Sequence, residues 1–312
     1  MAGLILRRLG LGCAIIAAAV TLIFAMIHAV PGDPVAVILG PRASPELQLA
    51  LREKMGLDQP LPVQLGRFFL QILQGDLGTD VFTNRSVADQ VFAVLPNTLL
   101  LIAAAIGWAA AVGIPLGAYA ALHPNTLLDR LTAVVSVSTI AVPSFVVALY
   151  ALLLFAVQLQ WFPAIGSGEG WLGRLHHLVL PAFAVGLAWV GYIARMVRAS
   201  TLEVLGENFV RTARSFGLPP AMVVRRYVLR VAILPTVTLL GVGIGSLLSS
   251  AVITEIVFAR PGLGKLIYDS VIERNYPVVM GAVLVSTGLF VVTMIVADLI
   301  NATLDPRVRE NA

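Results

Sequence analysis

Residues Glu207 to Pro235 read ENFVRTARSFGLPPAMVVRRYVLRVAILP and form a polar interruption between two strongly apolar segments. The stretch holds five arginines and a Gly-Leu-Pro-Pro break at 217–220, so it cannot face lipid along its length. A polar, broken segment of this size between apolar helices suits a surface that contacts another protein. The sequence therefore predicts a membrane-embedded chain that works within a larger assembly.

The composition also indicates a lipid environment. Of the 312 residues, 58% are hydrophobic and 12% are charged, and the mean hydropathy is +0.91. A soluble domain of this length could not bury so much apolar surface. The net charge of +4 could suggest nucleic acid, but no basic segment is interleaved with aromatic residues. We attribute the charge to arginines at helix ends, which orient spans and meet anionic head groups.

Apolar runs at or near the length of about 20 residues that crosses a hydrocarbon core occur six times. They cover residues 9–30, 97–121, 131–157, 178–197, 231–256 and 278–303. The first run is longer than the roughly 7–15 apolar residues of a secretory signal, and Pro31-Gly32-Asp33-Pro34 follows it instead of a small-residue cleavage site. We expect an all-α membrane protein with six transmembrane helices and a retained first span.

Positive charge predicts the orientation. Six crossings place both termini on one side, where twelve Lys and Arg residues fall, against four in the short loops of the other side. The positive-inside rule then makes both termini and the 198–230 loop cytosolic. We expect a first helix within 1–30, an extracytoplasmic loop at 31–96, a five-helix core at 97–303 and a cytosolic tail at 304–312.

The 31–96 loop has soluble character. Ser44 to Lys54 opens with Ser-Pro-Glu and predicts a short amphipathic helix that ends at the Gly56-Leu57-Asp58 turn. A second helix is expected from Val63 to Leu73, ending at Gly75. The loop is a small cap on the outer face, and either a functional cap or simple packing fits the pattern.

Helix-breaking and small residues lie within the spans. Three prolines remove backbone donors: Pro115, which is flanked by Gly113 and Gly117, Pro143 and Pro235. Such residues suit kinked helices along a pathway. They are also common in ordinary membrane helices. In the fifth span, small residues repeat every four positions and predict a close helix–helix contact, within the chain or with a second subunit. They are Gly241, Gly245 and Ser249.

Chemistry-bearing residues are few. We expect Glu255, Asp298 and Arg195 to lie near the membrane interfaces, where they snorkel or are hydrated. Because no carboxylate or histidine stands at mid-span, the energy for transport should come from a partner. Gly262-Leu263-Gly264-Lys265 lacks the residues of a phosphate-binding loop, and adjacent residues such as His176 and His177 point apart on a helix. We expect no catalytic, cofactor-binding or metal-binding residue, and inert packing for Cys13.

The inner loop predicts a helix from Glu203 to Arg214 that stops at Gly217, and a second helix from Ala221 through Arg230. We expect Phe209 and Ala213 on the exposed turn, suited to a groove on another protein. An interfacial helix on anionic lipid is the alternative.

At these residues the chain resembles the cytoplasmic coupling motif of binding-protein-dependent ABC importer permeases. That motif has Glu-Ala-Ala, three residues, Gly, nine residues and Ile-x-Leu-Pro. Aligned on Gly217, this chain has Arg211-Thr212-Ala213 in the first place and Tyr227, Leu229 and Arg230 in the last. With these residues the chain resembles the first permease of the dipeptide, oligopeptide and nickel branch, in which Arg-Thr-Ala is common at the first place.

The resemblance covers nearly the whole chain through short blocks that recur in order. They are Pro31-Gly32-Asp33-Pro34, Gly56-Leu57-Asp58, Gly75-Asp76-Leu77-Gly78, Thr254-Glu255, Pro261-Gly262-Leu263-Gly264, Tyr276-Pro277 and Asp305-Pro306-Arg307. The resemblance implies a type I importer permease fold in a bacterial inner membrane and uptake of di- or oligopeptides by alternating access. Nickel chelates and glutathione-like solutes are the alternatives within the family.

The implied partners are a second homologous permease, two cytosolic ATPase subunits that hold ATP and Mg²⁺, and an extracytoplasmic binding protein. The residues implied to couple to the ATPase are Glu207, Phe209, Arg211, Thr212, Ala213, Arg214 and Gly217. Two classes compete with this interpretation: an ion-coupled secondary carrier, which would transport alone, and a membrane scaffold without flux. Half of an ABC exporter usually carries its own ATPase domain, which does not fit in 312 residues.

Overall fold

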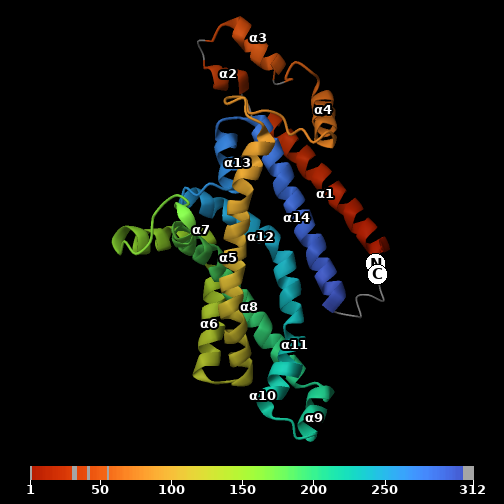
Figure 1. Cartoon of the computed structure of the whole chain (residues 1–312), viewed down its shortest axis with the longest axis vertical. Helices are drawn as coiled ribbons and strands as arrows, with labels where there is room; N and C mark the ends of the chain where they lie inside the picture. The colour runs from red at the N-terminus through yellow and green to blue at the C-terminus, as the bar shows by residue number, and fades with distance from the viewer. Residues whose placement is uncertain (1, 30–33, 41–42, 55, 305–312) are drawn as a thin grey trace. The chain divides into compact units, whose positions relative to one another are not determined.

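A computed structural model describes residues 2–29, 34–40, 43–54 and 56–304 (Figure 1). Among these residues the only β feature is an isolated antiparallel bridge between Thr79 and Ser86. The chain packs into two compact units, which we describe separately. The first unit holds residues 1–4, 99–260 and 293–312, and the second holds 5–98 and 261–292.

The helices follow one another with short connections. In chain order they are α1 (Ala2–Ala29), α2 (Pro34–Leu39), α3 (Pro45–Lys54), α4 (Leu61–Leu73), α5 (Val87–Leu122), α6 (Leu127–Ala141), α7 (Ser144–Ala151), η1 (Leu152–Gln158), α8 (Gly170–Leu205), α9 (Asn208–Ser215), α10 (Pro220–Met222), η2 (Val223–Val228), α11 (Leu229–Ala232), α12 (Leu234–Val257), α13 (Leu263–Ile272) and α14 (Tyr276–Leu304). Of these, η1 and η2 are π-helical.

Four continuous helical stretches are long and apolar enough to cross a membrane: Arg8–Ala29, Val87–Leu122, Gly170–Leu205 and Tyr276–Ala297. Two bent pairs pass the same test together. They are Leu127–Ala141 with Ser144–Gln158, and Pro220–Gly241 with Gly245–Val257. Counted as one span each, they bring the total to six, which confirms the predicted all-α, six-span fold.

The third predicted span, 131–157, is not a straight crossing. Its two halves meet at 96°. Val142 lies between them with extended backbone angles (φ −87°, ψ 121°), and Pro143 follows. A residue before proline is pushed out of the helical region, so α6 ends there and α7 starts in a new direction.

Glycines bring α5 and α8 close together in the first unit. A Cβ added at Gly113 would lie 2.9 Å from Ile193, and one at Gly117 would overlap the backbone of Ala194. Helix α5 continues through Pro115, and the glycines on either side of it make this region a packing seam between α5 and α8. Buried side chains of α5, α8 and α12 complete this core, among them Leu101, Ile193 and Leu247.

The small-residue ridge of α12 also makes a contact within the chain. A Cβ added at Gly241 would overlap the Cβ of Ala297, so α12 and the last turns of α14 approach closely there. The sequence left open whether this ridge contacts a helix of the same chain or of a second subunit, and a contact within the chain is confirmed at Gly241.

In the second unit, α13 and the first turns of α14 pack on the start of α5. Val87, Val91, Leu263, Val278 and Ala282 form this core. The hydroxyl of Thr98 accepts the Leu263 N–H at 2.8 Å. Both helices predicted in the outer loop are confirmed, as α3 and α4, and Gly75 follows α4 with a positive φ of 79°.

The turn at residues 79–86 is organised by Asp80. This carboxylate accepts the N–H groups of Phe82 and Thr83 at 2.8 and 3.0 Å and the Gln90 amide at 2.9 Å. Burial raises the pKa of Asp80, but the hydrogen bonds from Thr83, Gln90, Phe82 and Asn275 outweigh it and hold the pKa at about 2. The charged form is therefore the one that the fold stabilises.

We expect acid to loosen the second unit through Asp80. Because the folded pKa of about 2 lies below the ordinary value of about 3.9, the stabilisation is present above pH 4 and is lost as the pH falls through 2. The loss amounts to ~2 kcal/mol, and thermal unfolding of the purified protein between pH 2 and 5 measures it. Asp80→Asn should flatten that profile; an unchanged profile would assign the acid sensitivity to other groups.

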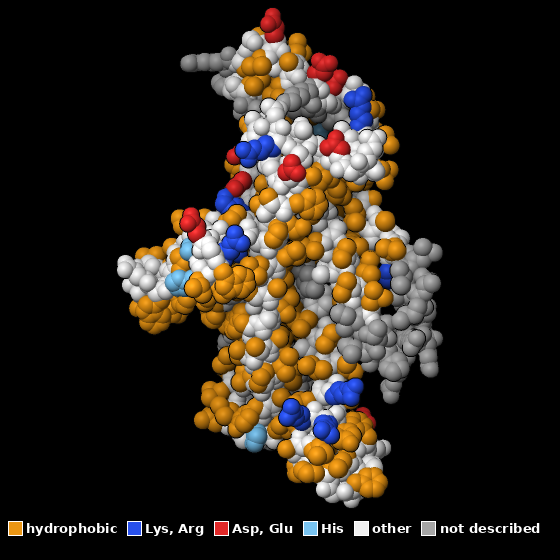
Figure 2. All heavy atoms as spheres, in the orientation of Figure 1, with side chains coloured by type: hydrophobic (Ala, Val, Ile, Leu, Met, Phe, Trp, Pro, Cys, Tyr) orange, Lys and Arg blue, Asp and Glu red, His pale blue; other side chains and the backbone are white. Residues whose placement is uncertain are grey.

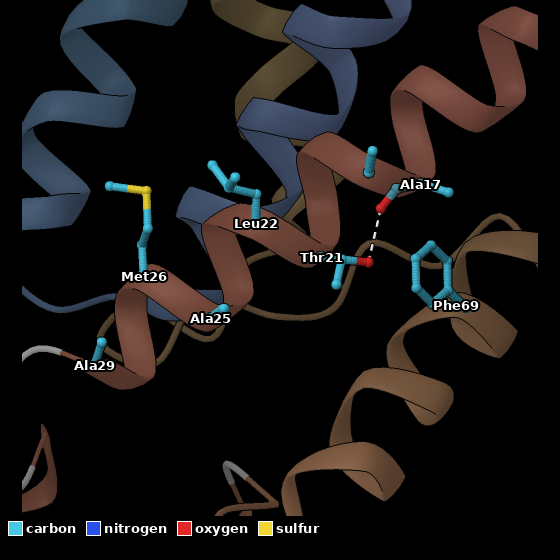
Figure 3. Close-up of a pocket in the computed structure, with 8 residues that line it drawn as sticks. Ala17, Thr21, Leu22, Ala25, Met26, Ala29 and Phe69 are labelled. Carbon is cyan, nitrogen blue, oxygen red and sulfur yellow. Dashed lines mark hydrogen bonds between the residues drawn. The ribbon is translucent and has the colours of Figure 1, made fainter.

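The outward face of α1 forms a shallow apolar groove with Phe69 of α4 (Figure 3). Its volume is about 780 Å³, and Thr21 is the one polar side chain among its lining residues. The Thr21 hydroxyl donates to the Ala17 carbonyl at 2.7 Å, drawn as the dashed line. Since the groove offers no free hydrogen-bonding side chain, it suits an apolar neighbour.

Candidate coupling site

Helix α9 follows α8 after a two-residue break. Helix α8 runs to Leu205, Gly206 caps it, and Glu207 is extended (φ −68°, ψ 148°) before α9 begins at Asn208. The predicted start of this helix at Glu203 was therefore wrong. Gly206 ends α8, because glycine is a poor helix former. Residues 203–205, which were expected in the short helix, therefore belong to α8.

A complete Schellman motif ends α9. The N–H of Gly217 donates to the Arg214 carbonyl at 2.9 Å, and the N–H of Leu218 donates to the Ala213 carbonyl at 3.4 Å. Gly217 has a φ of +73°, the left-handed conformation that the motif requires at this position. Pro219 and Pro220 follow and start α10, so the predicted stop at Gly217 is confirmed.

A small apolar core fixes α9 to the rest of the first unit. We call it the coupling core: Val204 from α8, Val210 and Ala213 from α9, and Val223, Val228 and Ala232 from the segment that follows. Leu205 and Leu218 pack at its edge. Ala213 is buried here, so its expected place on the exposed turn was wrong: its methyl group fills the core and does not face a partner.

The opposite face of α9 is exposed. It presents Glu207, Phe209, Arg211, Thr212 and Arg214. Phe216, which the sequence interpretation did not select, is 81% exposed, and Phe209 is 41% exposed. The two phenylalanines are seven residues apart, close to two helical turns, so they share one side of the segment. That spacing was visible in the sequence and could have identified Phe216.

The basic groups lie on a different side of α9 from the phenylalanines, because at about 100° per residue Arg211 and Arg214 fall roughly 200° and 140° around the helix from Phe209. Neither Arg211 nor Arg214 forms an ion pair with any described residue, so both guanidinium groups are available to acidic groups of a partner. Figure 2 shows hydrophobic and basic side chains together at the end of the unit that α9 to α11 form. Exposed phenylalanines on a rigid base are typical of a protein-docking surface, and exposed arginines on the same short segment add groups that can pair with acids.

An ion pair ties α6 to α8 near the same end. Arg198 Nη2 donates to Asp129 Oδ2 at 2.9 Å, and Arg198 Nε donates to the other carboxylate oxygen. The N–H of Asn125 also donates to Asp129, at 3.0 Å, and Thr126 caps α6. Since Asp129 is buried and lies on α6, this pair joins α6 to the last turns of α8 before the coupling core.

We expect Asp129→Asn and Arg198→Gln each to lower the temperature of thermal unfolding, because each leaves the other member of the pair without its partner. The double variant should lose little more than either single variant. Thermal unfolding of the four proteins forms a double-mutant cycle, with Arg195→Gln, an exposed arginine one turn before Arg198 on α8, as the matched control. Additive losses would show that the pair does not act as a unit.

The remaining candidates lie elsewhere. Glu255 is 1% exposed, so its expected hydration at the membrane interface was wrong, while Arg195 is exposed as expected. Arg260, also 1% exposed, was missed; burial lowers the pKa of its guanidinium, and the Glu255 carboxylate acts against that shift. The side chain of Asp298 lies outside the described residues.

The two adjacent histidines do not converge. His176 Nε2 pairs with the Trp161 carbonyl at 3.1 Å and His177 Nδ1 with the Gly173 carbonyl at 2.8 Å. Among the described residues, no group of three or more His, Cys, Asp and Glu side chains is placed to hold a metal ion.

Comparison with known proteins agrees with this architecture. The chain is 37% identical over 303 residues to the glutathione transport system permease protein GsiC of Salmonella paratyphi A, covering 97% of each chain. It is 36% identical to the probable D,D-dipeptide transport system permease protein DdpB of Escherichia coli K12, again over 97% of each. The inward-facing MetNI methionine ABC transporter shares the fold, with a TM-score of 0.57 at 18% identity over 69% of this chain and 95% of that one.

Two family models cover most of the sequence. Residues 1–87 match the N-terminal model of binding-protein-dependent transport system membrane components, and residues 113–310 match the model of the inner membrane component itself. The second match includes the whole coupling core and the exposed face of α9. The chain therefore belongs to the family of binding-protein-dependent transport system inner membrane components, the permeases of ABC importers.

Proposed function

We propose that this chain is the first permease subunit of an ABC importer that takes up short peptides. The observation that carries the proposal is the exposed face of α9, anchored through the coupling core to α8. Relatives that match nearly the whole chain are named for glutathione and for a D,D-dipeptide, both short peptides with free ammonium and carboxylate groups. We therefore place glutathione-like and dipeptide substrates in one class for this chain.

In this proposal a cytosolic ATPase subunit receives the α9 segment. Phe209 and Phe216 enter an apolar groove, Arg211 and Arg214 pair with acidic groups at its rim, and Glu207 and Thr212 complete the contact. Ala213 and Gly217 support this contact without touching the partner: Ala213 packs α9 against the coupling core, and Gly217 fixes the end of α9. When ATP closes two such subunits, the movement passes through the coupling core into α8.

The remaining partners follow from the family. A second, homologous permease completes the pathway, and an extracytoplasmic binding protein delivers the peptide to the outer loops. Both termini and α9 lie in the cytosol, as twelve Lys and Arg residues on that side favour. The energy comes from the ATPase subunits, so this chain is a transport subunit without a catalytic residue of its own.

Uptake by proteoliposomes tests the proposal. The complete complex with its binding protein should accumulate radiolabelled alanyl-alanine or glutathione only when ATP is supplied, and omitting the ATPase should abolish uptake. A nickel–histidine chelate serves as the probe for the metal-chelate alternative. Uptake by this chain alone, driven by an ion gradient, would instead identify a secondary carrier.

A further inference from the structure

A second concave site lies in the second unit, on the outer side of the proposed topology. It has a volume of about 310 Å³ and is lined by the end of α1, the α3–α4 region, residues 77–79 and the start of α14. This volume is at the lower end of the range of pockets that hold small organic ligands. The site is separate from the apolar groove of α1, because the two share no lining residue.

Opposite charges face this pocket from two helices. Glu53 belongs to α3 and Arg67 to α4. Neither forms an ion pair with another residue that the structure describes, so within this part of the chain both charges stand without a counter-charge. An unpaired carboxylate and an unpaired guanidinium at one small site match a ligand that carries one ammonium and one carboxylate.

The wall of the pocket contains a histidine with a free nitrogen. His28 Nδ1 lies 2.8 Å from the Phe24 carbonyl, which can only accept, so Nδ1 donates, and in that tautomer Nε2 is an acceptor. Nε2 is buried and has no hydrogen-bond partner among the described residues. A buried polar atom without a partner is costly, and a peptide N–H would satisfy it.

Apolar and amide groups complete the fit. Phe24 and Phe68 give the pocket aromatic walls, and the side chains of Gln64 and Gln71 reach it from α4. Gln64 already donates to the Gln59 carbonyl, which leaves its own carbonyl oxygen to accept. The ligand should therefore be short, zwitterionic and peptide-like, with side chains small enough for the space.

We infer that this pocket is an extracytoplasmic binding site for a short zwitterionic peptide, with Arg67 on the carboxylate, Glu53 on the ammonium and His28 Nε2 on a peptide N–H. The inference rests on the proposed function and adds a place where the substrate binds to the permease before it crosses the membrane. It assigns a binding role to the outer loop, for which simple packing was the alternative.

The test measures equilibrium binding of radiolabelled alanyl-alanine and of glutathione to the full complex in nanodiscs, without the binding protein. Wild type should bind at least one of them saturably, and Arg67→Gln, Glu53→Gln and His28→Phe should each weaken that binding by about tenfold or more. Arg85→Gln, which removes an exposed arginine outside the pocket, should bind as wild type does. Acetyl-alanyl-alanine amide, which lacks both charges, should not compete.

Absent wild-type binding, unchanged binding in the Arg67 and Glu53 variants, or equal competition by the blocked peptide would overturn the inference. If the complete importer still takes up peptide with ATP in that case, the proposed function stands and this site alone is rejected. If the complete importer takes up neither peptide, the proposed function fails and the inference falls with it.

Discussion

Gly217→Val is expected to reduce ATP-driven uptake to about a tenth of the wild-type rate or less, while the permease complex still assembles. Gly217 has a φ of +73°, and a β-branched residue in this left-handed conformation costs ~1–2 kcal/mol or more. Valine relieves that cost by leaving the conformation, which breaks the two hydrogen bonds of the Schellman motif and turns α9 away from its docking position. An energy of this size corresponds to roughly tenfold in an equilibrium.

The local structure distinguishes strain from crowding at this glycine. A Cβ added at Gly217 meets no described heavy atom within 4 Å, so the effect of valine should come from the backbone and not from a clash. Gly217→Asn should therefore keep most of the activity, because asparagine tolerates the left-handed region. Uptake in proteoliposomes and co-purification of the subunits provide the two readouts. Equal loss in the Asn and Val variants would contradict this explanation.

Phe216→Asp should have the second large effect, on docking of the ATPase. Burying a phenylalanine in a protein groove contributes ~1.5–3 kcal/mol, so its replacement by a charge should weaken ATPase binding by roughly tenfold to a hundredfold. Phe216 is 81% exposed and belongs to none of the apolar cores formed by the described residues, so the variant should fold normally. Co-purification of the ATPase with tagged permease measures docking, and ATP-driven uptake measures its consequence.

Two matched variants separate docking from folding. Phe216→Leu keeps an apolar side chain and should keep most of the binding. Ser215→Ala removes a neighbouring hydroxyl that bonds only to the Arg211 carbonyl of its own helix, and should behave as wild type. If Phe216→Asp retains the ATPase and transports normally, this face of α9 is not the docking surface.

The membrane spans were predictable because apolar length is a local property of the sequence. Six apolar runs correspond to the four continuous spans and two bent pairs, and Pro143 marks the position of the sharpest bend. The angle of that bend was not predictable, since it depends on what α7 packs against. Likewise, the length of α8 was underestimated, because its polar last turns lie beyond the apolar run that defined the span.

Single side chains at the coupling site were harder to place. Ala213 and Phe209 both look suitable for contact in the sequence, but only packing against Val223 and Val228 decides which of them is buried. Phe216 was missed because the expected helix ended at Arg214, so its seven-residue spacing from Phe209 was not considered. Glu255 and Arg260 show the same limit, since their burial arises from the fold around them and not from the local sequence.

One helix connects the coupling core with the outer end of the first unit. Helix α8 is 36 residues long, which at 1.5 Å per residue is about 54 Å, and its last turns carry Val204 and the ion pair to α6. A rod of that length works as a lever arm: a tilt of only ~5° about the end next to α9 displaces the other end by about 5 Å. In the proposed mechanism the stroke of an ATPase at α9 can therefore be small, and the stiffness of α8 around Pro181 sets how much of the movement reaches the far end of the helix.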